Sequence, residues 1–212
     1  MAILDDISAA VQSGKKNDVI ALVERAVDEG VAPDTILQDG LVSAMDIVGD
    51  KFSKGDIFVP EMLVAARAMS AATEILKPLL VAEGTEPLGK ACIGTVKGDM
   101  HDIGKNLVRM MLEGKGIEVI DLGVDVAPET FVECIRENED LGLVCASALL
   151  TTTLPALRDT VVAITESGLR SRVKILVGGA PVTQEYADEI GADAYTKDAG
   201  SAGVRAAQFF TE

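Results

Sequence analysis

Gly98-Asp99-Met100-His101-Asp102-Ile103-Gly104 is the stretch that decides the fold. It follows the apolar run 91–96, which predicts a β-strand, and precedes the amphipathic run 106–112, which predicts a helix. At its centre lies His101, the only histidine among the 212 residues. In open α/β sheets, ligands bind where a strand turns into a helix. The stretch therefore predicts an α/β domain with a ligand site at His101.

Alternating strand and helix patterns continue from this turn to the C-terminus. Continuous aliphatic runs between helical segments are typical of a parallel sheet covered on both faces. Five such units favour a flavodoxin-like (Rossmann-type) five-stranded parallel sheet of strand order 2-1-3-4-5. The predicted strands are 91–96, 118–121, 143–147, 173–177 and 194–195. The predicted helices are 103–113, 128–137, 154–166, 183–190 and 199–210.

The residues before about 84 have a helical pattern only. Four amphipathic segments begin near residues 4, 17, 33 and 60, and short connections between them predict a four-helix bundle. The stretch 84–89 is the predicted linker and hinge, because it holds two glycines and a proline in six residues. We therefore expect a helical-bundle domain over 1–88 and a Rossmann-like domain over 89–212.

Composition restricts the partners and the compartment. A net charge of −15 argues against nucleic acid as a partner, because phosphates would be repelled. No apolar run approaches the roughly 20 residues that span a bilayer, and the N-terminus lacks the basic start of a secretion signal. Cys92, Cys134 and Cys145 lie in apolar segments, which is typical of buried, reduced thiols. These features predict a cytoplasmic protein with neither membrane nor nucleic-acid partners.

Three loops at the carboxyl ends of predicted strands should meet near the switch point between the first and third strands. They are 98–104, 147–153 and 178–181, and they offer an imidazole, a run of hydroxyls and a double glycine. Each also has a purely structural interpretation: a solvated histidine, the start of a helix, and a tight turn. One histidine with scattered cysteines cannot build a protein-only zinc site, which takes about four ligands.

Other common ligands of such a sheet lack their motifs in this chain. The segment 98–105 departs from the phosphate-binding loop G-x-x-x-x-G-K-[ST] in spacing and in its final hydroxyl, and its aspartates would repel phosphate. A phospho-receiver needs an aspartate at the end of the third strand, where the chain has Ala146-Ser147-Ala148. G-x-G-x-x-G is absent from the turn, and no nucleophile elbow G-x-S-x-G occurs.

Asp99-x-His101-x-x-Gly104, Ser147-x-Leu149 and Gly178-Gly179 resemble the signature D-x-H-x-x-G, S-x-L, G-G of cobalamin-binding modules. The segment 45–62 resembles the helical cap that precedes this module in methionine synthase and in small corrinoid proteins. The resemblance covers nearly the whole chain. It points to a stand-alone corrinoid protein of a methyltransferase system, similar to those that serve methylamines or methoxy compounds.

The resemblance implies that His101 replaces the cofactor's own base as a ligand of cobalt. It also implies that Asp99 accepts the other ring N–H of His101 and that Thr153, in place of a serine, extends the relay; these three are the implied catalytic residues. The other residues that would line the cofactor are Gly94, Met100, Asp102, Ile103, Gly104, Ser147, Leu149, Thr151, Gly178, Gly179, Tyr195 and Ala199. Phe52, Phe58, Val59 and Met62 match the cap, with ordinary bundle core as the alternative.

The implied cofactor is cobalamin or a related corrinoid that is methylated in the working cycle. The protein would carry methyl groups between a substrate-specific methyltransferase and a methyl-accepting one, with a reductive reactivation protein as a further partner. It would then be a subunit and not a complete catalyst. The alternatives are a cobalamin-binding sensor without methyl transfer and a mutase subunit. The acidic charge and the lack of a signalling segment disfavour the sensor, and the mutase would need a substrate barrel.

Overall fold

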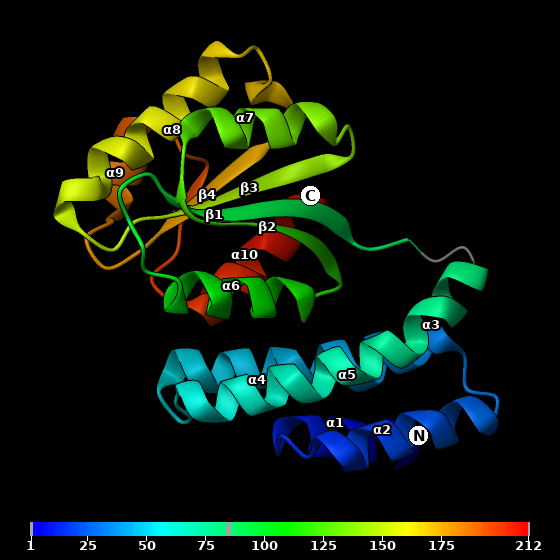
Figure 1. The fold of residues 1–212 in the computed structure, drawn as a ribbon. Coiled ribbons are helices and arrows are strands. Elements are labelled where there is room, and N and C mark those ends of the chain that lie inside the picture. Colours follow the sequence, from blue (N-terminus) through cyan, green and yellow to red (C-terminus); the bar gives the residue numbers. More distant parts are fainter. Residues whose placement is uncertain (1, 84–85, 212) are drawn as a thin grey trace. The chain divides into compact units, whose positions relative to one another are not determined.

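The computed structural model of the chain describes residues 2–83 and 86–211 (Figure 1). Two compact units are present: Met1–Pro87 with Glu113–Gly116, and Leu88–Leu112 with Ile117–Glu212. Of the predicted linker, residues 84 and 85 lie outside the described residues, and Gly89 already belongs to a strand.

The N-terminal unit is helical, as predicted. Its elements are α1 (Ala2–Gln12), α2 (Lys16–Asp28), α3 (Pro33–Thr35), the π-helical segment η1 (Ile36–Val42), α4 (Ser43–Lys54) and α5 (Val59–Glu83). The predicted third helix runs without a break from Pro33 to Lys54, but η1 gives it a π-helical stretch that the apolar pattern did not indicate. Gly55, at φ 79°, ends α4 in the left-handed conformation that glycine adopts readily.

The second unit contains a five-stranded parallel sheet of order β2-β1-β3-β4-β5, which confirms the predicted topology. The strands are β1 (Gly89–Val96), β2 (Ile117–Val126), β3 (Leu141–Ser147), β4 (Lys174–Gly178) and β5 (Ala194–Tyr195). The edge strand β2 is longer than predicted, because polar residues on its exposed side interrupt the apolar run.

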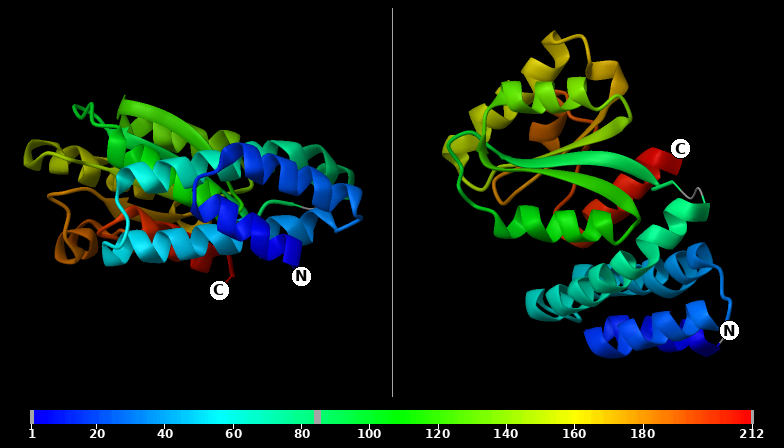
Figure 2. Two further views of the ribbon diagram at one scale, coloured as in Figure 1. Left: turned by 90° about the horizontal axis from the view of Figure 1, so that it is seen from below. Right: turned by 45° about the vertical axis from the view of Figure 1, so that its right-hand side comes forward.

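Five helices cover the two faces of this sheet. They are α6 (Ile103–Glu113), α7 (Pro128–Glu137), α8 (Leu154–Glu166), α9 (Gln184–Ile190) and α10 (Ala199–Thr211). Helices α7, α8 and α9 lie on one face of the sheet, and helices α6 and α10 lie on the other (Figures 1 and 2). Their apolar side chains form a separate core cluster on each face. The described helices include none that is long and apolar enough to cross a membrane.

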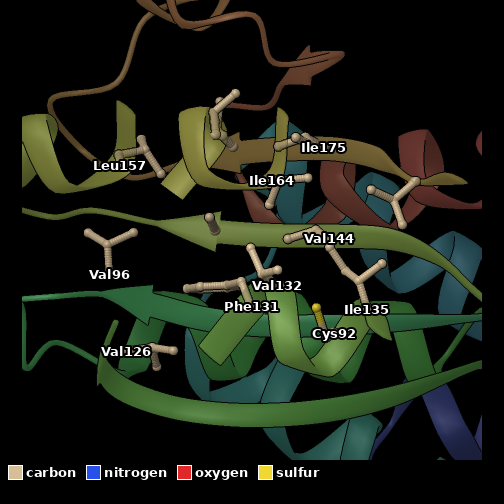
Figure 3. Close-up of a cluster of buried hydrophobic side chains, with 14 of the residues drawn as sticks. Cys92, Val96, Val126, Phe131, Val132, Ile135, Val144, Leu157, Ile164 and Ile175 are labelled. Atoms are coloured by element: carbon tan, nitrogen blue, oxygen red, sulfur yellow. The ribbon is translucent and has the colours of Figure 1, made fainter. Parts of the chain in front are cut away.

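The larger core cluster lies between the sheet and α7, α8 and α9. Figure 3 shows Phe131, Val132 and Ile135 of α7 grouped with Cys92 of β1 and Val144 of β3. The core is almost wholly aliphatic, as the composition predicted, with Phe131 as its fully buried aromatic ring. All three cysteines are free and buried. Burial raises the pKa of the Cys145 thiol to about 12, so this thiol stays protonated at neutral pH.

Candidate cofactor site

His101 lies in the loop between β1 and α6, at the carboxyl edge of the sheet. Its side chain is half-exposed, at 51%. The ring nitrogen Nδ1 lies 2.7 Å from Oδ1 of Asp99, so an ionised Asp99 keeps the proton on Nδ1. Within the described part of the chain, Nε2 has no hydrogen-bond partner. The ring therefore presents a free nitrogen lone pair on an accessible side chain.

Asp99 is fully buried and receives hydrogen bonds on both carboxylate oxygens. Oδ1 accepts the ring N–H and the backbone N–H of His101, the latter over 3.1 Å. Oδ2 accepts the backbone N–H of Leu149 over 2.7 Å and the hydroxyl of Thr153 over 2.9 Å. Burial alone would raise the pKa of Asp99, but these hydrogen bonds outweigh it and hold that pKa well below its usual value. The carboxylate is therefore ionised at neutral pH.

Thr153 connects the loop after β3 to Asp99. It is the last residue of the 3-10 turn η2 (Thr151–Thr153), which leads into α8, and it is buried. Its hydroxyl lies within hydrogen-bond distance of both Asp99 Oδ2 and the carbonyl oxygen of Leu150, at 2.9 Å each. One hydroxyl has one proton to donate, so Thr153 can exchange between these two acceptors.

The loops after β3 and β4 meet backbone to backbone. The N–H of Ala148 donates to the carbonyl oxygen of Gly178 over 3.1 Å. Gly179 has a φ of 127°, and a Cβ built on it would overlap the carbonyl oxygen of Ala148. Only glycine fits this position. Together with the bonds to Asp99, these contacts bring the three predicted loops to one edge of the sheet.

Two further residues hold the His101 loop, and the sequence analysis did not identify them. Thr95, fully buried near the end of β1, donates to the carbonyl oxygen of His101 over 2.8 Å and lies 3.1 Å from the hydroxyl of Ser147. Asp125 of β2 accepts the N–H of Gly98 over 2.7 Å. In the sequence, Thr95 could have been noticed as a hydroxyl residue within the apolar run of the first strand. Asp125 could have been noticed as an acidic residue near the end of the second strand.

Exposed apolar side chains occur in the same loops as the half-exposed imidazole and its carboxylate partner. Met100 and Ile103 are 68% and 71% exposed, and Leu149 and Leu150 are 41% exposed each. A group of exposed large apolar residues around a polar centre marks a ligand-binding surface. Three other residues in the implied lining, Asp102, Gly104 and Thr151, are also exposed.

Three residues in the implied lining have a packing environment instead. Gly94 faces the buried ring of Phe131, whose Cζ would lie 2.7 Å from a Cβ at residue 94. Tyr195 packs against the larger core cluster, and Ala199 is buried at the start of α10. Core packing is therefore a sufficient reason for glycine, tyrosine and alanine at these three positions, and no ligand is needed to account for them.

The four implied cap residues differ in exposure. Phe58, before α5, is 69% exposed, and Phe52 and Val59 are half-buried. Met62 is fully buried, which agrees with the alternative of ordinary core. Of these four residues, Phe58 therefore has the most exposed side chain.

The protein donors fit a metal that brings most of its own ligands. In the described residues, no three His, Cys, Asp or Glu side chains gather into a metal site. A bare ion would therefore lack ligands, whereas a metal inside a planar macrocycle needs one axial donor. Lys105, the nearest lysine after the loop, is buried and paired with Asp121 at 2.6 Å, so it is not free for a phosphate.

A carboxylate-backed imidazole at the carboxyl edge of a parallel sheet is the kind of site that binds a metal-containing cofactor. Comparison with known families gives the particular class. Residues 89–206 match a B12 binding domain, and residues 3–77 match a second B12 binding domain model. The chain belongs to the B12-binding proteins and, within them, to the corrinoid proteins of methyltransferase systems. Its cofactor is cobalamin or a related corrinoid.

Relatives and solved structures support this assignment over nearly the whole chain. Dimethylamine corrinoid protein 3 of Methanosarcina acetivorans is 44% identical over 204 residues, which are 96% of this chain and 95% of that protein. A chain of the methanol:cobalamin methyltransferase complex from Methanosarcina barkeri is 27% identical, with a TM-score of 0.87 over 99% of this chain and 80% of that one. A cobalamin-binding protein from Desulfitobacterium hafniense is 29% identical, with a TM-score of 0.82 and coverages of 97% and 98%.

Proposed function

We propose that the protein is a methyl carrier that binds its corrinoid with the cofactor's own base displaced and His101 as the lower axial ligand. The observation that carries this proposal is the 2.7 Å contact between Nδ1 of His101 and the buried carboxylate of Asp99. It fixes the proton on Nδ1 and leaves Nε2 as the donor atom. The bound cobalt supplies a centre that accepts and donates a methyl group.

The residues of the chain hold the axial ligand and set its release. Asp99 orients the imidazole and increases its electron donation, as carboxylates behind metal-binding histidines do. Thr153 and the N–H of Leu149 keep the carboxylate in place. Uptake of a proton by the Asp99–His101 pair would leave Nε2 without a free lone pair and would favour release of the metal.

Two methyltransferases would act on this carrier, one to load the methyl group and one to remove it, and a reductive protein would restore the oxidised cofactor. The similarity to dimethylamine corrinoid proteins supports a methylamine as the first donor to test. The similarity to a chain of a methanol:cobalamin methyltransferase complex supports direct docking of the loading enzyme.

In this proposal the chain divides at 88/89 into a helical cap and a cofactor domain. The cap would shield the cofactor from water and oxidants with apolar side chains, foremost Phe58. Methyl transfer would then require the cap to move aside, as the lids of many enzymes do. The exposure of Phe58 supports this role, because 69% of a phenylalanine is otherwise left in water.

Reconstitution with hydroxocobalamin tests the axial ligand. We expect the visible spectrum of the wild type to differ from that of His101→Ala, in which water occupies the lower position. Lys97→Ala is a matched control, because Lys97 is exposed in the same loop. Identical spectra for wild type and His101→Ala, with both proteins folded and loaded, would exclude the assigned ligand.

A second experiment tests methyl transfer. The reduced, loaded protein is mixed with a dimethylamine, trimethylamine or methanol methyltransferase and its donor, and methylation is followed spectroscopically. We expect at least one enzyme to methylate the wild type and none to act as efficiently on His101→Ala. A protein that binds cofactor through His101 but accepts no methyl group from any of the three would favour the sensor interpretation.

A further inference from the structure

Asp125 has an unusual backbone conformation at the carboxyl end of β2. Among the described residues it is the only non-glycine with a positive φ, at 54°. The pairing of β1 with β2 shifts register twice near this point, between Ile93 and Gly94 and between Gly94 and Val96. Left-handed backbone costs energy for residues with a Cβ, although aspartate tolerates it better than most. Such strain persists where surrounding contacts require it.

The contacts of Asp125 lead to the cofactor loop. Its carboxylate oxygen Oδ1 accepts the backbone N–H of Gly98 over 2.7 Å. Its own backbone N–H donates to the carbonyl oxygen of Asp99 over 2.9 Å. One residue of β2 thus binds both ends of the Gly98–Asp99 segment, from which the carboxylate behind His101 extends.

Core packing does not explain this arrangement, because Asp125 is exposed. The ion pairs between described residues do not include it either. The strained backbone and the carboxylate of Asp125 therefore serve to form its two hydrogen bonds to the loop. The left-handed conformation turns the N–H and the side chain of the same residue toward one segment.

We propose that Asp125 is a positioning residue for the axial ligand: it fixes the Gly98–Asp99 segment so that the Asp99 carboxylate reaches His101 and the loop after β3 together. The inference rests on the proposed function insofar as His101 binds cobalt. Without the Asp125 carboxylate, the loop loses the hydrogen bond to the Gly98 N–H, and only the backbone bond from residue 125 to the carbonyl oxygen of Asp99 can remain. The Asp99 carboxylate then holds the imidazole less firmly, and the ring samples its other tautomer.

Cofactor-free protein provides the first test, because His101 is the only histidine and its ring signals need no separate assignment. Long-range ¹H–¹⁵N spectra at about pH 8, where a free imidazole is neutral, report the tautomer. We expect the wild type to hold the proton on Nδ1 and Asp125→Gly to show a mixture. Asp125→Asn should resemble the wild type, because an amide oxygen also accepts the Gly98 N–H and asparagine tolerates positive φ.

Glycine and asparagine make a matched pair at this position. Asp125→Gly removes the acceptor while relieving the backbone strain, so a change in the tautomer cannot be attributed to strain. Glu118→Gln, which removes an exposed charge elsewhere on β2, controls for net charge. If Asp125→Gly does not fold, Asp125→Ala gives the same loss of the acceptor with the Cβ retained. An unchanged tautomer in the folded variant overturns the proposal.

Cofactor-loaded protein provides the second test. Outer residues that orient a metal ligand typically change metal affinity by about 10- to 100-fold when mutated. We expect Asp125→Gly to bind hydroxocobalamin about tenfold more weakly, with a smaller fraction in the histidine-ligated spectrum, and Asp125→Asn to stay within about twofold of the wild type. A histidine-ligated wild type with an unchanged Asp125→Gly overturns the role of Asp125 alone. A wild type without histidine ligation overturns the proposed function, whatever the cofactor-free spectra give.

Discussion

The hydroxyl oxygen of Thr153 lies 2.9 Å from Oδ2 of Asp99, although the two residues are 54 positions apart in the chain. The contact forms because β1 and β3 are parallel neighbours, with Thr95 paired to Ser147 at their carboxyl ends. Both following loops therefore leave the sheet at one edge. The carboxylate behind His101 is shared between these loops, so neither loop sets the orientation of the ring alone.

Replacement of Asp99 by asparagine should destabilise the protein in a pH-dependent way. The pKa of Asp99 in the folded state is lowered, so its ionised form contributes stability fully above the usual carboxyl pKa of about 3.9, and this contribution is lost as the pH falls toward the lowered pKa. We expect Asp99→Asn to be less stable than the wild type by about 1–3 kcal/mol at pH 7, with the difference shrinking below about pH 4. Urea unfolding at several pH values measures it, and a constant difference would contradict the assignment.

Thr153 offers a test of the shared carboxylate. Thr153→Val removes a buried donor to Asp99 while keeping the shape of the side chain, and should cost about 1–2 kcal/mol. It should also raise the pKa of Asp99 relative to the wild type, because one stabilising hydrogen bond is lost. Thr153→Ser retains the hydroxyl and serves as the control. Carboxyl ¹³C titration measures the pKa of Asp99, and urea unfolding measures the loss of stability. If Asp99 has the same pKa in the valine and serine variants, the Thr153 hydroxyl does not stabilise the Asp99 carboxylate.

Thr95 should matter for the ring of His101 through the backbone. Thr95→Val leaves the carbonyl oxygen of His101 without its buried donor and should cost about 1–2 kcal/mol of folding free energy. The ring signals of His101 should shift, whereas Thr95→Ser should leave them close to those of the wild type. The ¹H–¹⁵N spectra described for Asp125 supply the measurement. Unchanged ring signals in a stable Thr95→Val protein would contradict this role.

Gly179 should not tolerate a side chain. Gly179→Ala places a Cβ against the carbonyl oxygen of Ala148 and should cost about 3 kcal/mol or more. Gly191→Ala is the matched control: its φ of 81° is also positive, but nothing lies within 4 Å of the added Cβ, so about 1 kcal/mol is expected. Thermal unfolding of the two variants separates the stability lost to backbone strain from the stability lost to steric overlap of the added Cβ. Equal losses would show that the close approach of the two loops is not rigid.

The periodicity of apolar residues determined most of the fold. The helices 103–113, 128–137 and 154–166 coincide with α6, α7 and α8, because regular amphipathic spacing is a local property of the chain. The extent of β2 and the π-helical segment η1 were not predicted. An edge strand needs no continuous apolar run, and the register of helical hydrogen bonds leaves little trace in apolar spacing.

The sequence by itself also determined the pair of Asp99 and His101, because the two residues are neighbours in one turn and their motif carries the chemistry. Only the tertiary structure decided that Thr95 and Asp125 hold that turn, that residue 179 must be glycine, and that Met62 belongs to the core. These facts depend on strand register, on the irregular pairing of β1 with β2, and on the distance between separate loops. Such quantities arise when distant segments pack together, and no local pattern of residues encodes them.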